Sequence, residues 1–460
     1  MNAPDPSRLN PPEAAAGRRG GFVRSVMVLV SGTALAHGIT AAAMPILSRL
    51  YSPADFGLLA VFSACLGIVS AVACLRFELA IALPASSSEA ADLLWLSVLC
   101  CLVISAVLAL PALLAPAAVA HSLGQPALAP FVGLLPLGFL LAGCYSALQF
   151  WHVREKHFGW LAKTRIGQSA GSAGAQIGMG VASAGPIGLL IGQVMNTGIA
   201  CVALSGALRR SALPSWTHLR GLIYRYRRFP MLSAPEALAN AAALQLPVIL
   251  IAGAVAPAEA GYLSMAMFVI QAPMSLMGTA VSQVFLSQAP QALREQRMGA
   301  FTTQVLGGLF KTGAGPLLAI GLLAPLLFPT VFGAGWERAG WLVTWMTPWF
   351  LAQFLAVPLS MSLHVCGRQR EALLLQIAGM GLRVGLVLVA LRWAPSAVAE
   401  IYSISGALFY VGYLLLVLHV TGASVSEVCH AFKGGLSAAL GWVVLAGGLG
   451  LLMLLLGPAA

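Results

Sequence analysis

The sequence predicts an all-α, polytopic membrane protein built from two parallel six-helix bundles and one extra C-terminal helix. Three observations predict this class: the apolar composition, the recurrence of long apolar runs, and an internal repeat. Of the 460 residues, 59% are hydrophobic and only 8% are charged, whereas soluble globular chains carry about 25% charged residues. A run of about 20 apolar residues crosses a bilayer as a helix, and such runs recur along almost the whole chain. This composition favours one membrane domain over several soluble ones.

Apolar runs between polar or Pro/Gly breaks predict where the helices lie. They cover residues 22–48, 54–83, 89–118, 127–150, 161–183, 186–208, 230–256, 258–287, 304–331, 338–364, 370–392, 397–420 and 434–456. We therefore expect a disordered cytoplasmic tail at 1–21, a bundle at 22–208, an interfacial linker at 209–229, a second bundle at 230–420 and an extra transmembrane helix within 421–460.

The distribution of lysine and arginine orients these helices. Cytoplasmic loops hold an excess of both residue types. Most of the 25 lysines and arginines fall in segments on the same side as the N-terminus, whereas Arg49, Arg338 and Arg392 fall on the other side. The pattern predicts a cytoplasmic N-terminus. It also explains the net charge of +11 without a nucleic-acid partner.

The segment SPADFGLLAVF, at the expected turn between the first two helices, recurs as APAEAGYLSMAMF in the second half of the chain. Pro53 aligns with Pro257, and Gly57 aligns with Gly261 at the same offset. An even number of helices separates the two copies, so the halves insert in the same orientation and are related by an axis along the membrane normal. Parallel repeats of this kind are a transporter architecture with a substrate site between the halves.

The same turn carries a helix start signal. Ser52 is the expected N-cap of the second helix, Pro53 is its first residue, and Asp55 completes a capping-box pattern. The stretch is therefore interpreted as a structural turn and not as a catalytic loop.

Several segments carry a family resemblance. SGTALAHGITAAAMPILSRLYSPADFG, RFELAIALP, YRRFPMLSAPEALAN, FGAGWERAG and CGRQREALLLQ resemble bacterial polysaccharide or O-antigen flippases of the multidrug/oligosaccharidyl-lipid/polysaccharide exporter superfamily. The resemblance implies a V-shaped, two-bundle fold in the bacterial inner membrane that moves an undecaprenyl-diphosphate-linked oligosaccharide by alternating access. It implies membrane lipids and a polysaccharide polymerase or chain-length machinery as partners. Phe268 stands where family members often have an arginine, so no cavity cation is carried over there.

Four arginines are candidates for binding the lipid diphosphate. Arg24 and Arg49 mark the two ends of the first helix, and interfacial anchoring is the alternative. Arg76, on a helix expected to reach residue 83, should lie near the inner boundary, where a guanidinium binds phosphate bidentately or serves as an anchor. Glu78 falls on another face of that helix and is not expected to pair with Arg76. Arg383 should lie near the midplane, binding acidic sugar or phosphate or packing within the protein.

The seventh predicted helix carries a polar stripe. Glu236, Asn240 and Pro247 lie on one of its faces at helical spacing. Glu236 and Asn240 are candidates for coupling to an ion, and the alternative for Glu236 is a carboxylate stabilised by the helix N-terminus. Pro247, like Pro45 in the first helix, removes a backbone hydrogen bond and leaves a carbonyl available for an ion or for gating.

Other polar residues in the predicted helices complete the candidates. Glu78 and His37 are ion-coupling candidates, although a lone histidine is more often hydrogen-bonded within its bundle. Gln245 and Gln271 are suited to bind sugar hydroxyls or to join helices. The expected coupling ion is H+ or Na+, and no other cofactor is predicted. The eight cysteines lack CxxC spacing, so no metal site is expected.

A flippase for a lipid-linked oligosaccharide, which is not an enzyme, is the leading hypothesis. The alternative is a cation-coupled multidrug antiporter of the same superfamily. That activity would favour acidic cavity residues, for which only Glu78 and Glu236 are candidates. A membrane O-antigen ligase or polymerase is less favoured because it needs an outer loop to hold glycan, and the predicted outer loops are short.

Overall fold

The computed structural model describes the backbone of residues 11–210 and 214–456, and most side chains from Val28 onward. In these residues every regular element is a helix. Eleven helical segments are long and apolar enough to cross a membrane. The long helices α7 and α12, whose bounds follow, pack beside them. The predicted all-α, multi-pass membrane class is confirmed.

The N-terminal bundle contains six long helices. They are α1 (Pro11–Leu50), α2 (Pro53–Ser70), α4 (Ser87–Leu114), α6 (Leu134–Arg154), α7 (Phe158–Val181) and α8 (Ile187–Leu204). The short helices α3 (Phe77–Ala80), α5 (Pro116–Ser122) and α9 (Gly206–Arg210) and the 3-10 helix η2 (Pro126–Phe131) connect them. α1 packs along α7, α7 along α8, and α4 along α6.

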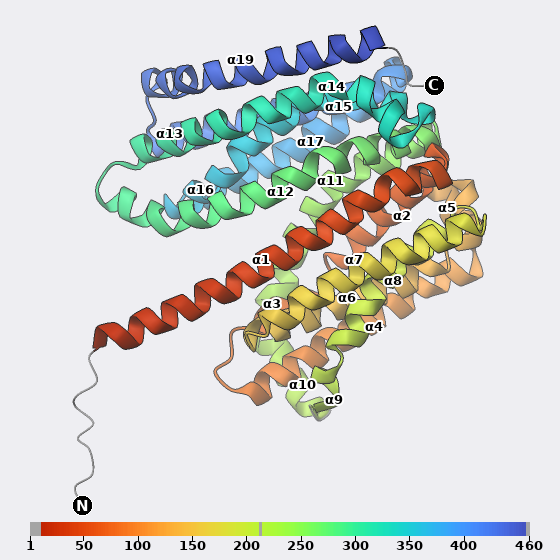
Figure 1. Ribbon diagram of the computed structural model, residues 1–460. Coiled ribbons are helices and arrows are strands. Elements are labelled where there is room, and N and C mark those ends of the chain that lie inside the picture. Colours follow the sequence, from red (N-terminus) through yellow and green to blue (C-terminus); the bar gives the residue numbers. More distant parts are fainter. Residues whose placement is uncertain (1–10, 211–213, 457–460) are drawn as a thin grey trace, which may run out of the picture.

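The C-terminal bundle repeats this pattern. It consists of α11 (Ala234–Ala254), α12 (Pro257–Arg294), α13 (Met298–Leu309) continued through a π turn into α14 (Gly315–Phe332), α15 (Glu337–Ala356), α16 (Met361–Val365), α17 (Gln369–Trp393) and α18 (Val398–Thr421). A further helix, α19 (Val425–Leu456), packs on the outside against α13 and α14 (Figure 1). Two bundles and one appended C-terminal helix match the predicted architecture.

The linker between the bundles contains an amphipathic helix, α10 (Trp216–Arg225). Its buried residues Leu219 and Leu222 pack on the start of α4. Arg225 Nη1 donates a hydrogen bond to Glu89 Oε1 at 2.8 Å, and the Tyr226 hydroxyl donates to the same oxygen at 3.1 Å. The linker is thus anchored to the N-terminal bundle.

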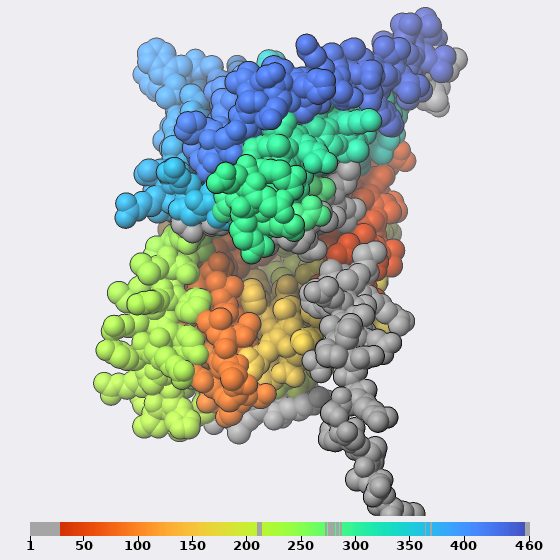
Figure 2. Space-filling view, turned by 90° about the vertical axis from the view of Figure 1, so that its left-hand side faces the viewer, coloured from red at the N-terminus to blue at the C-terminus, as the bar shows by residue number. Residues whose placement is uncertain are grey.

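The molecule has two ends, which are named here by their residues. The linker end holds α10, α3 and the starts of α11 and α17. The turn end, opposite to it, holds the α1–α2 turn at Tyr51–Ser52 and the start of α12 (Figure 1). Figure 2 looks onto the linker end, where the teal and blue part of the C-terminal bundle lies above the orange and yellow N-terminal bundle and the yellow-green linker region, and the surface between them is hollowed.

The prediction of one continuous helix over residues 54–83 is wrong for its second half. α2 ends at Ser70, and the chain turns through residues 71–76 before the short helix α3. Leu75 and Arg76 have φ values of 49° and 64°, a left-handed conformation that non-glycine residues rarely adopt. Packing holds this turn, because Phe77 is 1% exposed and the Cys74 thiol donates to the carbonyl of Gly143.

Several other boundaries differ from the prediction. α1 begins at Pro11, so residues 11–21 are helical where a disordered tail was expected; proline is tolerated in a first helical turn, and EAAA favours helix. α12 continues to Arg294. α19 begins at Val425 because Ser424 and Glu427 form a capping box, with two reciprocal hydrogen bonds of 3.2 Å.

At the turn end the two copies of the repeat pack against each other. A Cβ atom on Gly57 would overlap the carbonyl oxygen of Pro257, and a Cβ on Gly261 would overlap the carbonyl oxygen of Pro53. Each glycine therefore allows α2 and α12 to approach at backbone distance. The contact is reciprocal, as expected for two halves related by a twofold axis that passes between these helices.

Side chains reinforce this closure between the bundles. The Trp336 indole, 2% exposed, donates its Nε1 hydrogen to the carbonyl of Ser48 at 2.9 Å, and its ring packs edge-on against Phe56 and Tyr262. Gln125 Nε2 donates to the carbonyl of Ala252. The bundles are thus held together at the turn end.

Candidate functional site

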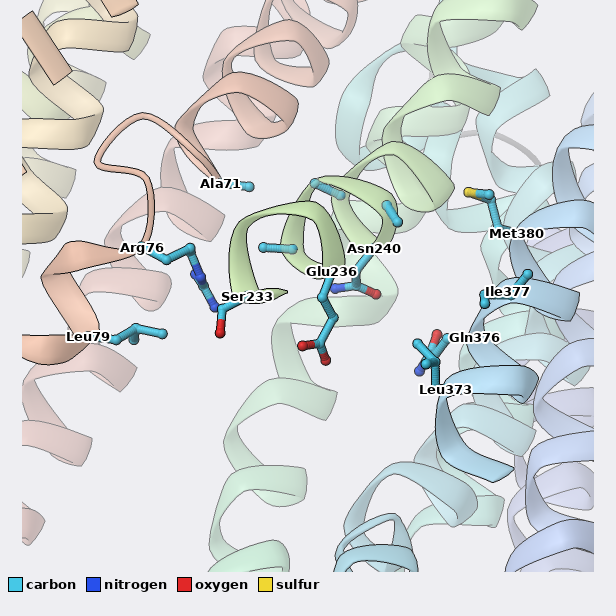
Figure 3. A pocket seen from close by; sticks show the side chains of 13 residues that line it. Ala71, Arg76, Leu79, Ser233, Glu236, Asn240, Leu373, Gln376, Ile377 and Met380 are labelled. Carbon is cyan, nitrogen blue, oxygen red and sulfur yellow. The ribbon is translucent and has the colours of Figure 1, made fainter. Parts of the chain in front are cut away.

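A pocket of about 550 Å³ lies between the bundles at the linker end. Its walls come from the turn after α2, from α3, from the start of α11 and from α17. The lining residues are Ala71, Arg76, Leu79, Ser233, Glu236, Ala237, Ala239, Asn240, Ala241, Leu373, Gln376, Ile377 and Met380 (Figure 3). Both bundles therefore contribute to one site.

Arg76 reaches the pocket because the chain breaks before it. The left-handed backbone at Arg76 redirects the chain out of the α2 axis, and its side chain points toward α11 (Figure 3). The side chain is 30% exposed, while its Nε atom is buried and finds no hydrogen-bond partner in the described residues. A guanidinium in this state retains N–H groups that can bind an anion.

The prediction that Arg76 and Glu78 do not pair is wrong. Arg76 Nη1 lies 3.7 Å from Glu78 Oε1. The prediction assumed that both residues belong to one helix, in which positions i and i+2 face apart. The left-handed residue at the start of α3 removes that constraint. Glu78 itself lies behind the pocket wall, 4% exposed.

The start of α11 supplies the polar face of the pocket. A π-helical turn (Phe229–Ser233) precedes α11, and Glu236 lies in the first helical turn. Glu236 and Asn240 are both exposed into the pocket and lie between Arg76 on one side and Gln376 on the other (Figure 3). Of the polar stripe predicted on this helix, Glu236 and Asn240 line the pocket. Pro247 is buried further along α11.

Arg383 lies away from the pocket. It is 3% exposed, and its guanidinium carbon lies 4.2 Å from the ring centroid of Phe409, 5.3 Å from that of Tyr410 and 5.8 Å from that of Trp349. Within the part of the chain that the structure describes, its Nε and Nη2 atoms have no hydrogen-bond partner. This environment corresponds to the packed alternative for Arg383.

The remaining candidates are dispersed. Arg49, at the turn end, donates from Nη2 to the carbonyl of Thr330 at 3.3 Å, which links α1 to α14. Gln245 lies against Gly67 where α11 meets α2. His37 and Gln271 are exposed on α1 and α12.

Two further candidates add little to the site geometry. The side chain of Arg24 lies outside the described residues. Pro45, like Pro247, is inside a helix.

Some lining residues carry no functional signal in the sequence. Ser233 was not predicted, because it reads as one more residue before a helix. Gln376 was not among the predicted site residues either. Leu79, Leu373 and Ile377 are indistinguishable from membrane-facing residues until the fold places them.

The pocket combines one guanidinium, one carboxylate, amide and hydroxyl groups, and an apolar wall. This set can bind an anion at Arg76 and hydroxyl groups at Ser233, Asn240 and Gln376, with an aliphatic chain along Leu373 and Ile377. In the described part of the chain, no group of three or more His, Cys, Asp or Glu side chains could hold a metal ion. The pocket thus presents one cation, one anion and neutral hydrogen-bonding groups beside an apolar wall.

The two-bundle fold is similar to that of solved transporters of the MOP superfamily. The structure of the lipid II flippase MurJ in an inward closed conformation matches 93% of this chain and 92% of its own, with a TM-score of 0.70 and 12% identity. A MOP superfamily transporter from Pyrococcus furiosus, with a binding pocket of reverse polarity, covers 87% of this chain and 96% of its own, with a TM-score of 0.53 and 14% identity.

A multidrug resistance MATE family transporter in an inward-facing conformation covers 85% of this chain and 94% of its own, with a TM-score of 0.54 and 14% identity. A search of the curated proteins found no match.

A family model described as polysaccharide biosynthesis protein matches residues 46–339, more than half of the chain. The chain belongs to this family.

Proposed function

We propose that the protein is a flippase that translocates an undecaprenyl-diphosphate-linked oligosaccharide across the bacterial inner membrane for surface polysaccharide assembly. The observation that carries this proposal is the pocket between the bundles, in which Arg76 from one half faces Asn240 and Gln376 from the other. Arg76 binds the diphosphate, the amide side chains bind sugar hydroxyls, and the apolar wall accepts the start of the lipid tail.

The linker end faces the cytoplasm in this proposal. Lysine and arginine are concentrated on the side of the N-terminus and the linker, and α10 exposes Trp216 and Tyr224, as interfacial helices do. The pocket thus receives substrate from the inner leaflet, where lipid-linked units are available, and alternating access releases it outside. A polysaccharide polymerase is the expected downstream partner.

Multidrug antiport is the second candidate. Glu236 lines the pocket, and a carboxylate there suits a cationic drug coupled to H+ or Na+. The adjacent Arg76 disfavours a cationic substrate by like-charge repulsion. Export of cationic dyes by the purified protein, without flipping of a lipid-linked glycan, would support antiport instead.

The flippase is tested by complementation of a bacterium that lacks its O-antigen flippase, with lipid-linked repeat units measured in each leaflet. We expect units to reach the outer leaflet with the wild-type chain. Arg76→Ala should reduce surface polysaccharide by about tenfold or more at equal protein level, the effect of losing one charge-assisted contact. Arg392→Ala, an exposed arginine at the other end of α17, is the matched control and should retain export. Units that stay inside with the wild-type chain would contradict the proposal.

A further inference from the structure

The carboxylate of Glu78 is buried with an incomplete set of partners. Its Oε2 atom is buried and has no hydrogen-bond partner among the described residues. Its Oε1 atom is 3.7 Å from Arg76 Nη1, which is beyond hydrogen-bond distance. The two charges therefore attract each other through space while the N–H groups of Arg76 remain free to bind a ligand in the pocket.

Arg76 is the main countercharge of Glu78. The elements packed against α3 are α4, α6 and the π-helical turn before α11. From α4 the thiols of Cys100 and Cys101 face Glu78, and from its own segment Cys74 does. On α6, Arg154 donates to the carbonyls of Ile81 and Pro84, and it is not among the charges that shift Glu78. The π-helical turn (Phe229–Ser233) contains no titratable side chain.

Burial raises the pKa of Glu78 above the ordinary value for a glutamate, and a backbone hydrogen bond at Glu78 and the positive charge of Arg76 each offset part of that rise. A ligand that neutralises the positive charge of Arg76 therefore changes the pKa of Glu78. Since Arg76 lines the pocket and Glu78 does not, a ligand can alter the pair without touching the carboxylate.

We propose that Glu78 is an internal counter-anion that competes with the substrate diphosphate for Arg76 and takes up a proton when the diphosphate binds. This inference rests on the proposed function of the pocket. The diphosphate engages the guanidinium, and its negative charge then lies near the carboxylate. Both changes favour the neutral acid, so one proton from the solution in the pocket adds to the Glu78 carboxylate.

The sign of the pH dependence follows. Between the pKa of Glu78 in the free protein and its higher pKa in the complex, binding is accompanied by proton uptake, so affinity rises as the pH falls. Above the pKa in the complex the carboxylate stays charged in both states. There it competes fully with the ligand, and affinity is lowest.

The test uses the full-length protein in lipid nanodiscs and farnesyl-diphosphate-linked N-acetylglucosamine as the probe. Both phosphates of this probe are esterified, so the probe does not itself titrate near neutral pH. Calorimetry from about pH 5.5 to 8.5 gives Kd, and two buffers of different ionisation enthalpy give the number of protons taken up. We expect wild-type protein to take up as much as about one proton per ligand.

The Glu78→Gln variant should bind the probe about tenfold more tightly than wild type at the alkaline end, with an affinity that no longer depends on pH. Glu155→Gln, an exposed glutamate in the α6–α7 turn, is the matched control and should behave like wild type. If Glu78→Gln does not fold, the proton count of the wild-type protein decides. The inference is overturned if the wild-type protein takes up no protons on binding, or if Kd of Glu78→Gln depends on pH as the wild-type Kd does.

Failure of the proposed function gives a different result. In that case the probe does not bind the wild-type protein at any pH, or Arg76→Ala binds it as well as wild type does. If Arg76→Ala weakens binding while Glu78→Gln leaves the pH profile unchanged, the pocket retains its function and only the counter-anion role is lost.

Discussion

Arg383 is a cation held by aromatic rings in the interior of the C-terminal bundle. The rings of Phe409, Tyr410 and Trp349 come from α18 and α15 and surround a guanidinium from α17. A desolvated cation–π contact contributes ~2 kcal/mol, and the aliphatic part of the side chain adds packing. At this residue the geometry favours a role in joining three helices over direct contact with substrate.

Replacement of Arg383 should therefore destabilise the fold. We expect Arg383→Ala to cost about 2 to 4 kcal/mol, from lost cation–π contacts and a cavity between the rings. The measurement is the thermal unfolding midpoint in detergent, together with Kd for the diphosphate probe in the folded fraction. Arg392→Ala, at the exposed end of the same helix, should leave the midpoint near wild type. Loss of binding with an unchanged midpoint would show instead that Arg383 contacts substrate.

The sequence predicts which polar residues line the pocket better than it predicts which residues they contact. Arg76, Glu236 and Asn240 were candidates because polar groups in membrane helices are costly, and all three line one pocket. The Arg76–Glu78 pair could not be predicted, because the left-handed backbone at Arg76 has no glycine, asparagine or proline to signal it.

The sequence signals the first residues of helices more clearly than their last residues. The predicted capping box at Ser52 and Asp55 is confirmed, with Asp55 Oδ2 accepting from the Ser52 backbone at 2.9 Å. The end of α2 at Ser70 has no such signal. The apolar run continues through Leu75, and the helix stops earlier because the turn packs against α6.

The pairing of α2 with α12 depends on a glycine at the point of contact. Gly57→Ala places a methyl group against the Pro257 carbonyl, so the two helices must separate. We expect a lower thermal midpoint and reduced export of lipid-linked units. The matched control is Gly38→Ala, because nothing lies within 4 Å of a Cβ at Gly38. Equal behaviour of the two variants would show that the close approach of α2 and α12 is dispensable.

Over the whole molecule the two ends differ in how the bundles meet. At the turn end, backbone contacts, the Trp336 indole and Arg49 link the halves. At the linker end the halves are separated by the pocket. Access to Asn240 should therefore be one-sided.

This asymmetry is measurable by labelling. Asn240→Cys is expected to react with a membrane-impermeant maleimide in inside-out vesicles but not in right-side-out vesicles, because the turn end is closed. Reactivity of the parent protein, which has an exposed Cys429, is subtracted as background. Adding Gly57→Ala should increase labelling from the outside. Equal labelling from both sides of Asn240→Cys alone would contradict a closed turn end.

The architecture as a whole could be predicted because its determinants are repeated. Apolar runs gave the helices, and the aligned Pro53 and Pro257 gave two parallel halves. The separation of the halves at one end could not be predicted, since it depends on which helix faces touch across the twofold axis. Apolar residues such as Leu373 and Leu388 are equally hydrophobic, and only the fold distinguishes the pocket from the lipid.

The reciprocal glycine contact also limits which residues each half can accept at the position of contact. Gly57 packs on the second copy of the motif and Gly261 on the first, so a side chain gained in either half must be accommodated by the backbone of the other. The two positions are therefore coupled by packing although they are far apart in the chain. In related sequences, the two positions should accordingly change together.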